Sequence, residues 1–386
     1  MLDTVRLYFS DTFGSADGVR VIMAPGRVNL IGEYTDFNDG FVLPMTVDRG
    51  VYLGIRPRVD QRVRIASSRF GELIDVSLGD FKRPDPGHWS CYVLGVVEEL
   101  RLLGLISTGF EAVIDGNLNL GAGLSSSAAL EIATAVALQT LFKFEMSRID
   151  IAILCQRVEH RYAGVMCGIM DQFASGLGRK GHALLLDCRT LSHVSIPVAL
   201  GDYRIVIISS EVKRELASSA YNERRSQCED GVLVFKQKDP TVEALRDVSI
   251  EALEACGGEL SEVVYRRCRH VITETARVLD ASAALGAGNL TQFGALMTQS
   301  HLSLRDDFEV SCAELDCLVD IASGVEGVLG ARMTGAGFGG CTVTLIHKDS
   351  IDALREQLLT YKERFSLNPE MFVLDGNGEA GEVLAN

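Results

Sequence analysis

The sequence predicts an α+β fold for a chain of 386 residues. Strand-like and helix-like segments are mixed along it, without the strict strand–helix–strand alternation that a doubly wound parallel sheet requires. Hydrophobic residues make up 47% of the chain, which is typical of a globular protein with a well-filled core. The length favours two domains of ordinary size, although no linker is evident in the sequence. We place the boundary at residue 195, which gives domains 1–195 and 196–386.

Predicted strands dominate the first third of the chain. Residues 2–15 suggest a short helix that ends near Gly14, and residues 19–24 suggest a strand that Pro25 and Gly26 interrupt. Further strands are expected over 41–43, 51–56, 63–66, 74–76 and 110–115, and residues 89–103 return to helical spacing.

Helix signals are more frequent in the remainder. Ser147 is expected to cap a helix that carries Asp150 in its first turn and ends at Gly164. Ser311 and Glu314 have the spacing of a capping box before another apolar stripe. Further helices are expected over 168–177, 215–234, 261–285 and 289–302, and further strands over 183–186, 203–209, 328–333 and 341–346.

Charge and cysteine content narrow the class of protein. The net charge of −15 leaves no basic excess for binding nucleic acid or an anionic membrane, although a local positive site could still hold an anionic ligand. The ten cysteines are scattered without a C-x-x-C pair or zinc-like spacing, so we expect reduced thiols in a cytoplasmic protein. We find no signal-peptide pattern and no apolar run long enough to span a bilayer.

The stretch 119–138, NLGAGLSSSAALEIATAVAL, is expected to organise the rest of the chain. Its two glycines let backbone N–H groups approach an anion, and its serines open a predicted helix whose N-terminus favours phosphate. Serine hydroxyls could also donate to phosphate or bind Mg²⁺. Glu131 is the one charged residue between Ser125 and Leu138, so the helix should be buried nearly all round. From spacing alone, a simple turn before a core helix is an equally good interpretation.

Other nucleotide-binding signatures do not fit. The chain lacks the G-x-x-x-x-G-K-[ST] pattern of P-loop proteins and the catalytic set of protein kinases. Residues 335–340, GAGFGG, match G-x-G-x-x-G, but the CTVTLI that follows predicts a strand where a dinucleotide-binding fold needs a helix. We expect instead a tight turn that brings the backbone close to a ligand or to a neighbouring loop.

These glycine-rich loops occur together with a third motif. Residues 24–44, APGRVNLIGEYTDFNDGFVLP, closely resemble the signature of galactokinases, which are members of the GHMP small-molecule kinase superfamily. The second and third motifs of that family resemble residues 121–129, GAGLSSSAA, and 330–341, GARMTGAGFGGC. Further matches lie at 89–96, 158–173, 221–229 and 301–316. The resemblance is specific, because several motifs occur in the right order from residue 24 onward.

The resemblance implies a two-domain GHMP kinase. Its N-terminal domain would be similar to ribosomal protein S5 domain 2, its C-terminal domain would be ferredoxin-like, and the active site would lie in the cleft between them. The implied activity is an ATP- and Mg²⁺-dependent conversion of galactose to α-D-galactose 1-phosphate. The expected partners are therefore the sugar and ATP, and we expect a monomer that binds neither nucleic acid nor a membrane.

The resemblance also assigns roles to matching positions. Asp171 matches the catalytic aspartate, and Arg27 matches the arginine that keeps it ionised and stabilises the transferred phosphoryl group. The sugar would contact Glu33, Tyr34, Asp36, Gly168 and Tyr221. ATP would contact Trp89, with Tyr92 nearby, and the phosphate loop formed by Gly121, Gly123, Leu124, Ser125, Ser126 and Ser127. Ser126 and Glu159 would lie on the Mg²⁺ side.

Each of these roles has a structural alternative. Arg27 and Asp171 could form an ion pair that only supports the fold. Glu159 could be a solvated helix residue and Trp89 a core anchor. Tyr221 could lie on the surface of a polar helix.

Among the positions that depart from the family pattern, two leave the preferred sugar open. Tyr34 stands where the family usually has histidine, and Phe37 stands where it usually has tyrosine. A 1-kinase for N-acetylgalactosamine, arabinose, a uronic acid or another hexose is therefore an alternative to galactokinase activity. A non-catalytic sugar-sensing regulator on the same fold is a further alternative, but the retained serines, Arg27 and Asp171 argue against it.

Overall fold

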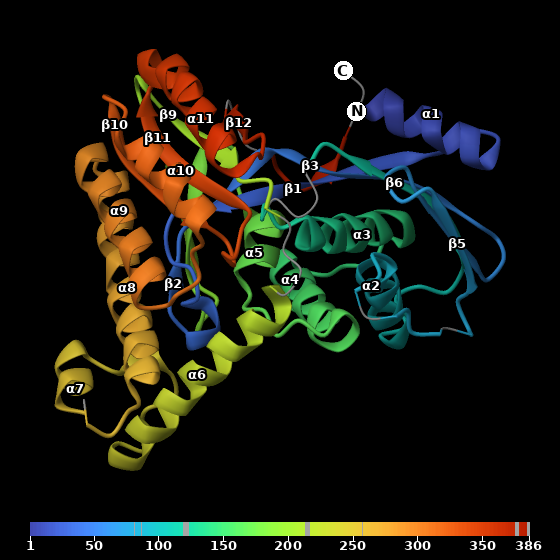
Figure 1. Ribbon diagram of the computed structural model, residues 1–386. Coiled ribbons are helices and arrows are strands. Elements are labelled where there is room, and N and C mark those ends of the chain that lie inside the picture. Colours follow the sequence, from blue (N-terminus) through green and yellow to red (C-terminus); the bar gives the residue numbers. More distant parts are fainter. Residues whose placement is uncertain are drawn as a thin grey trace.

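The computed structural model describes residues 1–80, 82–85, 87–118, 123–212, 217–256, 258–374 and 378–383. Within these residues the strands form sheets of six, four and three, with helices packed on their faces (Figure 1). The α+β prediction is therefore confirmed. Among the helices described, not one combines the length and the apolar character needed to cross a bilayer.

The six-stranded sheet has the order β13-β1-β3-β6-β4-β5 and is antiparallel except where β4 pairs with β6. Its strands are β1 (Arg20–Asn29), β3 (Pro44–Pro57), β4 (Arg62–Ser67), β5 (Glu72–Ser77), β6 (Phe110–Gly116) and β13 (Gly381–Glu382). Helix α1 (Leu2–Phe13) covers one face by packing Val5 and Phe9 against it. The predicted end of this helix at Gly14 is confirmed, because Gly14 adopts the left-handed conformation of a C-cap.

The other face of this sheet carries α3 (Ser126–Phe142), around which α2 (Ser90–Leu102), α4 (Arg148–Val158) and α5 (Met170–Leu177) pack (Figure 1). Residues 128–138 of α3 are all buried, as the scarcity of charge predicts. Ser147 caps α4 as predicted, since its hydroxyl accepts from the Asp150 N–H. The regular α-helix ends at Val158, and one wider turn over 159–163 continues it to Gly164, which is the left-handed C-cap residue as predicted.

The four-stranded sheet has the order β10-β11-β9-β12 and is antiparallel throughout. It consists of β9 (Tyr203–Ser209), β10 (Val328–Thr334), β11 (Cys341–His347) and β12 (Glu370–Val373). Helices α10 (Ala313–Ser323) and α11 (Ile351–Phe365) cover one of its faces. Helix α9 (Leu290–Asp306) packs on β10 and on the long helix α8 (Glu262–Gly286), whose other neighbours include α6 (Ala217–Lys238) and α7 (Ile250–Ala255). The short sheet joins β2 (Phe41–Val42), β7 (His182–Asp187) and β8 (His193–Pro197).

Pro25 and Gly26 interrupt the regular pairing of the first strand as predicted, but they do not end the strand. Strand β1 continues to Asn29 across an irregular step, at which Pro25 lies opposite Gly50 and Arg27 lies opposite Thr46. A bulge of this kind accommodates proline, because the ladder of hydrogen bonds is interrupted there. Beyond the bulge the Arg27 N–H donates to the carbonyl oxygen of Leu124 over 3.1 Å. The strand is thereby attached to the loop that precedes α3.

The predicted capping box at Ser311 and Glu314 is wrong. Helix α10 has Cys312 as its N-cap residue, one position later than predicted. The Ser311 hydroxyl donates instead to Asp316 Oδ1 over 2.5 Å. The helix therefore starts without a side-chain cap hydrogen bond at its N-cap residue.

The two predicted domains, residues 1–195 and 196–386, share strands of the same sheets. Residue 195, the predicted domain boundary, falls within β8 of the short sheet. Strand β13, from the second half, pairs with β1 of the first. The division into 1–195 and 196–386 therefore stays a prediction.

The backbones of α9 and β10 touch at Gly294. A Cβ at this position would lie 2.3 Å from the carbonyl oxygen of Leu329. We expect Gly294→Ala to lower the free energy of unfolding by about 1–3 kcal/mol, because the helix must move away from the strand. Chemical denaturation measures this change. The control is Gly286→Ala in α8, where the Cβ would lie 3.8 Å from the Ile196 side chain. Equal losses in the two variants would contradict the prediction.

Candidate active site

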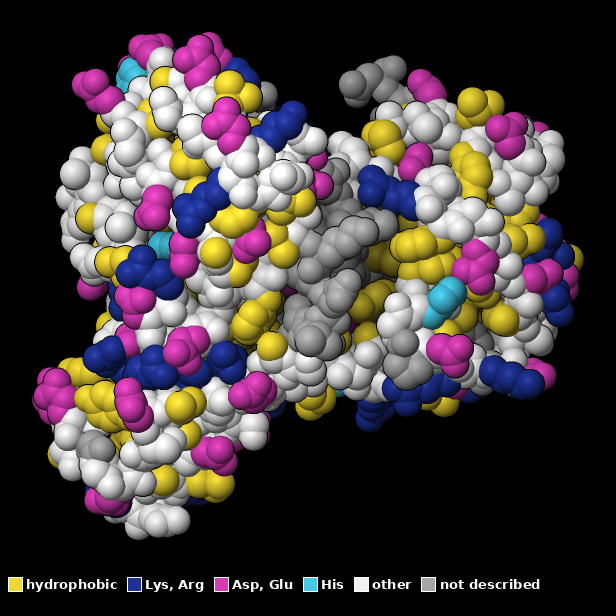
Figure 2. All heavy atoms as spheres, in the orientation of Figure 1, with side chains coloured by type: hydrophobic (Ala, Val, Ile, Leu, Met, Phe, Trp, Pro, Cys, Tyr) yellow, Lys and Arg dark blue, Asp and Glu magenta, His cyan; other side chains and the backbone are white. Residues whose placement is uncertain are grey.

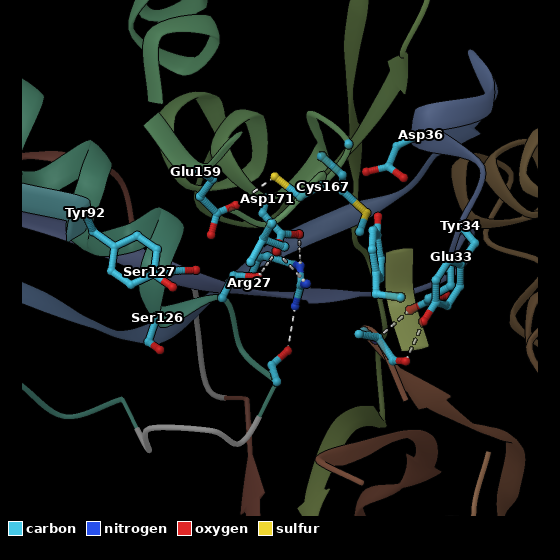
Figure 3. Close-up of a pocket in the computed structure, with 18 residues that line it drawn as sticks. Arg27, Glu33, Tyr34, Asp36, Tyr92, Ser126, Ser127, Glu159, Cys167 and Asp171 are labelled. Atoms are coloured by element: carbon cyan, nitrogen blue, oxygen red, sulfur yellow. Dashed lines mark hydrogen bonds and ion pairs between the residues drawn. The ribbon is translucent and has the colours of Figure 1, made fainter. Parts of the chain in front are cut away.

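A cavity of about 280 Å³ opens between segments from both halves of the chain (Figure 3). This volume is of the order found for small-molecule pockets. Among the described residues, it is lined by Arg27, Glu33, Tyr34, Asp36, Tyr92, Gly123, Ser125, Ser126, Ser127, Glu159, Val165, Cys167, Gly168, Met170, Asp171, Tyr221, Gly335 and Ala336. Most of the predicted site residues therefore lie together. Of the others, Trp89 lines a neighbouring cavity, Leu124 is buried next to Gly123, and Gly121 lies outside the described residues.

The centre of the cavity is an arginine–carboxylate pair. Arg27 Nε donates to Asp171 Oδ1 over 2.7 Å, and a second guanidinium nitrogen donates to Asp171 Oδ2 over 2.9 Å. The third nitrogen donates to the carbonyl oxygen of Gly123 over 2.7 Å. Arg27 is buried, whereas the Asp171 side chain keeps 27% of its exposure and faces the cavity. The pair therefore supports the fold and also presents a carboxylate to a ligand.

The N-terminus of α3 forms one side of the cavity. Ser125 is the N-cap residue and has a left-handed backbone, with φ of 55°. Its hydroxyl donates to Asp171 Oδ2 over 2.5 Å, so it is directed at the carboxylate. Ser126 and Ser127, in the first turn, also line the cavity. Because the first N–H groups of a helix lack partners within it, this end of α3 is suited to an anion such as phosphate.

Asp36 and Gly168 lie on another side of the cavity. A Cβ on Gly168 would lie 1.9 Å from Asp36 Oδ2, so only glycine lets this carboxylate occupy its place. The Phe37 N–H donates to Asp36 Oδ1 over 3.0 Å. Burial, and then the nearby Asp171 charge, raises the pKa of Asp36 from 3.8 to about 6, although backbone N–H groups oppose this shift. Asp36 is thus a hydrogen-bond acceptor whose burial the surrounding protein groups compensate only in part.

Glu33 is held by the second half of the chain. Its carboxylate forms a salt bridge with the fully buried Arg332 of β10. It also accepts from the Gly335 N–H over 3.0 Å and from the Thr334 hydroxyl over 3.3 Å. Arg332 was not predicted, because nothing in its sequence neighbourhood indicates a partner almost 300 residues away. These contacts join the predicted sugar-binding segment to the loop at 335–340, which confirms the close approach of that loop to a neighbour.

Tyr34 lies in an aromatic cluster at the same end of the cavity. Its hydroxyl donates to the carbonyl oxygen of Ala336 over 2.6 Å. Its ring lies 5.1 Å from that of Tyr221, 6.1 Å from that of Phe37 and 4.5 Å from that of Phe308, measured between centroids. Tyr221 is therefore part of the cavity wall and not a surface residue of α6. Tyr34 and Phe37, the two departures that leave the preferred sugar open, therefore contact each other.

Glu159 is buried and is not a solvated helix residue. The Cys167 thiol donates to its Oε2 over 2.7 Å, and Gln172 Nε2 donates to the same oxygen over 3.1 Å. Burial raises the pKa of Glu159, and the Asp171 charge adds to this effect. The described residues contain no cluster of three or more side chains that would hold a metal ion alone. Cys167 lies within the matched segment 158–173, but its contact with Glu159 was not predicted.

A second, largely apolar cavity adjoins the first and shares Ser126 with it. The Trp89 ring stacks on Phe70 with centroids 5.6 Å apart, and its Nε1 donates to Glu72 Oε2 over 3.1 Å. On the face shown in Figure 2, hydrophobic side chains gather in the hollow over α2 and α3. Trp89 thus serves as a core anchor and also lines a cavity. Phe70 was missed, because its residue type at a turn between two strands gives no signal of a site.

Three family models match the chain. The model for the N-terminal domain of GHMP kinases matches residues 91–179, and the model for the GHMP kinase C-terminal domain matches residues 281–363. The galactokinase galactose-binding signature matches residues 8–57. The last range contains Arg27, Glu33, Tyr34 and Asp36 of the cavity described above.

Relatives of known class cover nearly the whole chain. A galactokinase of Roseiflexus sp. (strain RS-1) is 41% identical over 389 residues, which are 100% of this chain and 99% of the relative. A galactokinase of Chloroflexus aurantiacus is 44% identical over 352 residues, 91% of this chain and 90% of the relative. The crystal structure of Lactococcus lactis galactokinase complexed with galactose has a TM-score of 0.95 and 38% identity, covering 99% of this chain and 100% of that one.

The raised pKa of Asp36 predicts a pH-dependent effect of Asp36→Asn on stability. Folded Asp36 binds its proton more tightly than unfolded Asp36, so the stability due to that proton is complete below pH 3.8 and is lost as the pH rises to about 6. The asparagine variant lacks this loss. We therefore compare the free energy of unfolding of Asp36→Asn minus that of the parent at two pH values. This difference should be about 1–2 kcal/mol higher at about pH 7.5 than at about pH 4.5.

Urea denaturation at the two pH values measures this difference. The control is Asp85→Asn on an exposed segment, which should change stability by the same small amount at both. A pH-independent difference for Asp36→Asn would contradict the prediction.

Proposed function

The chain belongs to the galactokinase family of GHMP kinases, and on this premise we propose that it phosphorylates the anomeric hydroxyl of galactose with ATP, giving α-D-galactose 1-phosphate. One observation carries the proposal for these residues: the Arg27–Asp171 pair faces a cavity between the N-terminus of α3 and the segment of Asp36 and Gly168. A phosphate donor on the α3 side and a sugar on the Asp36 side would meet at Asp171.

In this mechanism the C1 hydroxyl oxygen of the sugar attacks the γ-phosphorus of ATP. The new P–O bond forms as the bond from that phosphorus to the ADP oxygen breaks. Asp171 orients the hydroxyl and accepts its proton, while Arg27 fixes the carboxylate with two hydrogen bonds. Positioning and charge stabilisation are the main requirements of phosphoryl transfer, so a buried guanidinium beside the transferred group is apt.

The ATP site follows from the two adjoining cavities. Ser125, Ser126 and Ser127 at the N-terminus of α3 would bind the phosphates. The base would stack in the apolar cavity of Trp89 and Phe70, which meets the main cavity at Ser126.

Ser126 and Glu159 are the residues that would hold Mg²⁺. Magnesium bound with a nucleotide usually takes only one or two carboxylates from the protein and the rest of its ligands from phosphate and water. A single cavity-lining carboxylate on this side, whose burial is incompletely compensated, fits that pattern. When bound, the ion would neutralise charge on the β- and γ-phosphates.

The sugar-binding residues proposed are Glu33, Tyr34, Asp36, Gly168 and Tyr221. Of the two carboxylates, Asp36 is the freer acceptor for sugar hydroxyls, since Glu33 is already bound to Arg332, Thr334 and Gly335. The hydroxyl of Tyr34 is engaged by Ala336, so its ring supplies mainly an apolar surface. Preference for a sugar other than galactose is the second candidate, and the Tyr34–Phe37 contact favours it. We also propose a cytoplasmic monomer; the ten cysteines, all free thiols, fit the location.

The first experiment measures ADP release from Mg·ATP by the purified protein across a panel of free sugars. We expect galactose to give the highest kcat/KM. A higher value for another sugar would keep the kinase reaction and move the difference in specificity to Tyr34 and Phe37. Sugar binding without turnover of any sugar would contradict the proposed reaction.

Substitution of the proposed catalytic carboxylate separates chemistry from binding. We expect Asp171→Asn to lower kcat by at least about 10²-fold, because the amide cannot accept the hydroxyl proton. Galactose affinity, measured by calorimetry, should stay within about threefold of the parent, because the sugar contacts at Asp36 and Gly168 remain. Asp85→Asn serves as the exposed control. A kcat of Asp171→Asn near the parent's would exclude the role assigned to this residue.

A further inference from the structure

A buried glutamine connects the site to a carboxylate that the mechanism does not use. Gln172 of α5 is fully buried, next to Asp171 in the sequence. Its Nε2 donates to Glu159 Oε2 over 3.1 Å and to Glu131 Oε2 over 3.3 Å. Both hydrogens of the amide are therefore used, one on the proposed Mg²⁺-side residue and one on Glu131 of α3. Glu131 is fully buried and does not line the cavity.

One side-chain oxygen of Glu131 and the side-chain oxygen of Gln172 have no hydrogen-bond donor among the described residues. Neither Glu131 Oε1 nor Gln172 Oε1 has a hydrogen-bond partner among the described residues, and both atoms are buried. A buried acceptor without a donor costs free energy, and two on adjoining side chains are unusual in a native protein. An ionised glutamate cannot supply the missing donor, because both of its oxygens can only accept hydrogen bonds. A protonated glutamate has an O–H and can donate.

The electrostatic surroundings favour the same protonation state. Burial is the largest cause of a pKa for Glu131 well above its ordinary value, and the charges of Glu159 and Asp171 raise it further. The hydrogen bond from the Gln172 amide opposes these effects and lowers the pKa of Glu131. Cys155 and Tyr92, whose pKa values are raised mainly by burial, lie near Glu131 and add no positive charge.

We propose that Glu131 is a neutral carboxylic acid that donates from Oε1 to Gln172 Oε1, and that it thereby fixes Gln172 and the orientation of Glu159. A carboxylic acid and an amide form two antiparallel hydrogen bonds, of which the Nε2–Oε2 bond is present. Glu131 is then a positioning residue that acts on Glu159 from outside the cavity. The proposal rests on the proposed function for the role of Glu159 at Mg²⁺, but not for the proton on Glu131.

This arrangement explains how Glu159 is kept in one orientation. Its carboxylate is contacted by the Gln172 amide, the Cys167 thiol and the Ser127 hydroxyl. Of these three groups, Gln172 is itself hydrogen-bonded to Glu131, which lies outside the cavity. Groups that orient a metal ligand in this way typically change metal affinity or activity by 10–100-fold when removed.

The kinetic test compares Glu131→Leu with Glu131→Gln in the full-length enzyme. Leucine removes the donor and should raise the Mg²⁺ concentration for half-maximal activity by about tenfold, with a smaller effect on the galactose KM. Glutamine has an N–H where the acid has its O–H, so it should rescue most of that loss. The control is Glu99→Gln, a buried glutamate of α2 that pairs with Arg157 and Arg161 away from the cavity. It should leave the Mg²⁺ dependence unchanged.

Two kinetic outcomes would overturn the proposal. Equal damage in Glu131→Leu and Glu131→Gln would mean that the negative charge of Glu131 is needed. An unchanged Mg²⁺ dependence in Glu131→Leu would mean that Glu131 positions nothing.

An infrared measurement tests the proton directly and needs neither activity nor a stable leucine variant. The spectrum of the parent minus that of Glu131→Gln, at neutral pH, should contain the C=O band of a protonated carboxyl. A carboxylate band in its place would overturn the proposal. If the parent phosphorylates no sugar, the proposed function fails, while the infrared result still decides the state of Glu131.

Discussion

The guanidinium of Arg27 holds the candidate active site together. It joins three segments that are distant in the sequence: its own strand β1, the start of α5 through Asp171, and the loop before α3 through Gly123. Because Arg27 is buried, loss of a partner would leave a desolvated charge without compensation. The guanidinium therefore links the N-terminal ends of both helices to β1, in addition to the apolar packing of α3 on the sheet. This link brings a helix N-terminus to within reach of a carboxylate.

A second buried arginine has the corresponding role across the cavity. Arg332 of β10 binds Glu33, so the segment after β1 is attached to the second half of the chain. The cavity thus lies between two arginine–carboxylate pairs, of which only the Arg27–Asp171 pair presents a partly exposed carboxylate. A structural ion pair and a catalytic pair are therefore compatible descriptions of Arg27 and Asp171. The fold uses the contact for support, and the exposed edge of the carboxylate remains available for chemistry.

The sequence allowed prediction of features that depend on nearby residues. The cap at Ser147, the helix end at Gly14 and the burial of α3 follow from local chemistry. The resemblance to a set of family motifs identified most of the residues that line the cavity. It relates positions that are distant in the sequence, which hydrophobic periodicity cannot do. The same local reasoning did not show that the strand continues beyond Pro25 by pairing with β3, and it placed the N-cap of α10 one residue too early.

Contacts between distant residues were not predictable from local patterns. Glu33 and Arg332 are 299 positions apart, and Glu131 and Gln172 are 41 apart. Each member of such a pair looks like an ordinary charged or polar residue in its own segment. Only the fold shows that the charge is buried and which partner offsets it.

Strand β13 determines when the edge of the six-stranded sheet at β1 can be covered. It covers the edge of β1 by pairing with Ile22 and Met23, and Glu382 accepts two hydrogen bonds from Arg20, 362 residues earlier. An uncovered strand edge invites pairing with other chains. During translation β1 leaves the ribosome long before β13, so this edge stays open while the second half of the protein is being made. The first sheet can therefore be completed only after the distal part of the chain has been made.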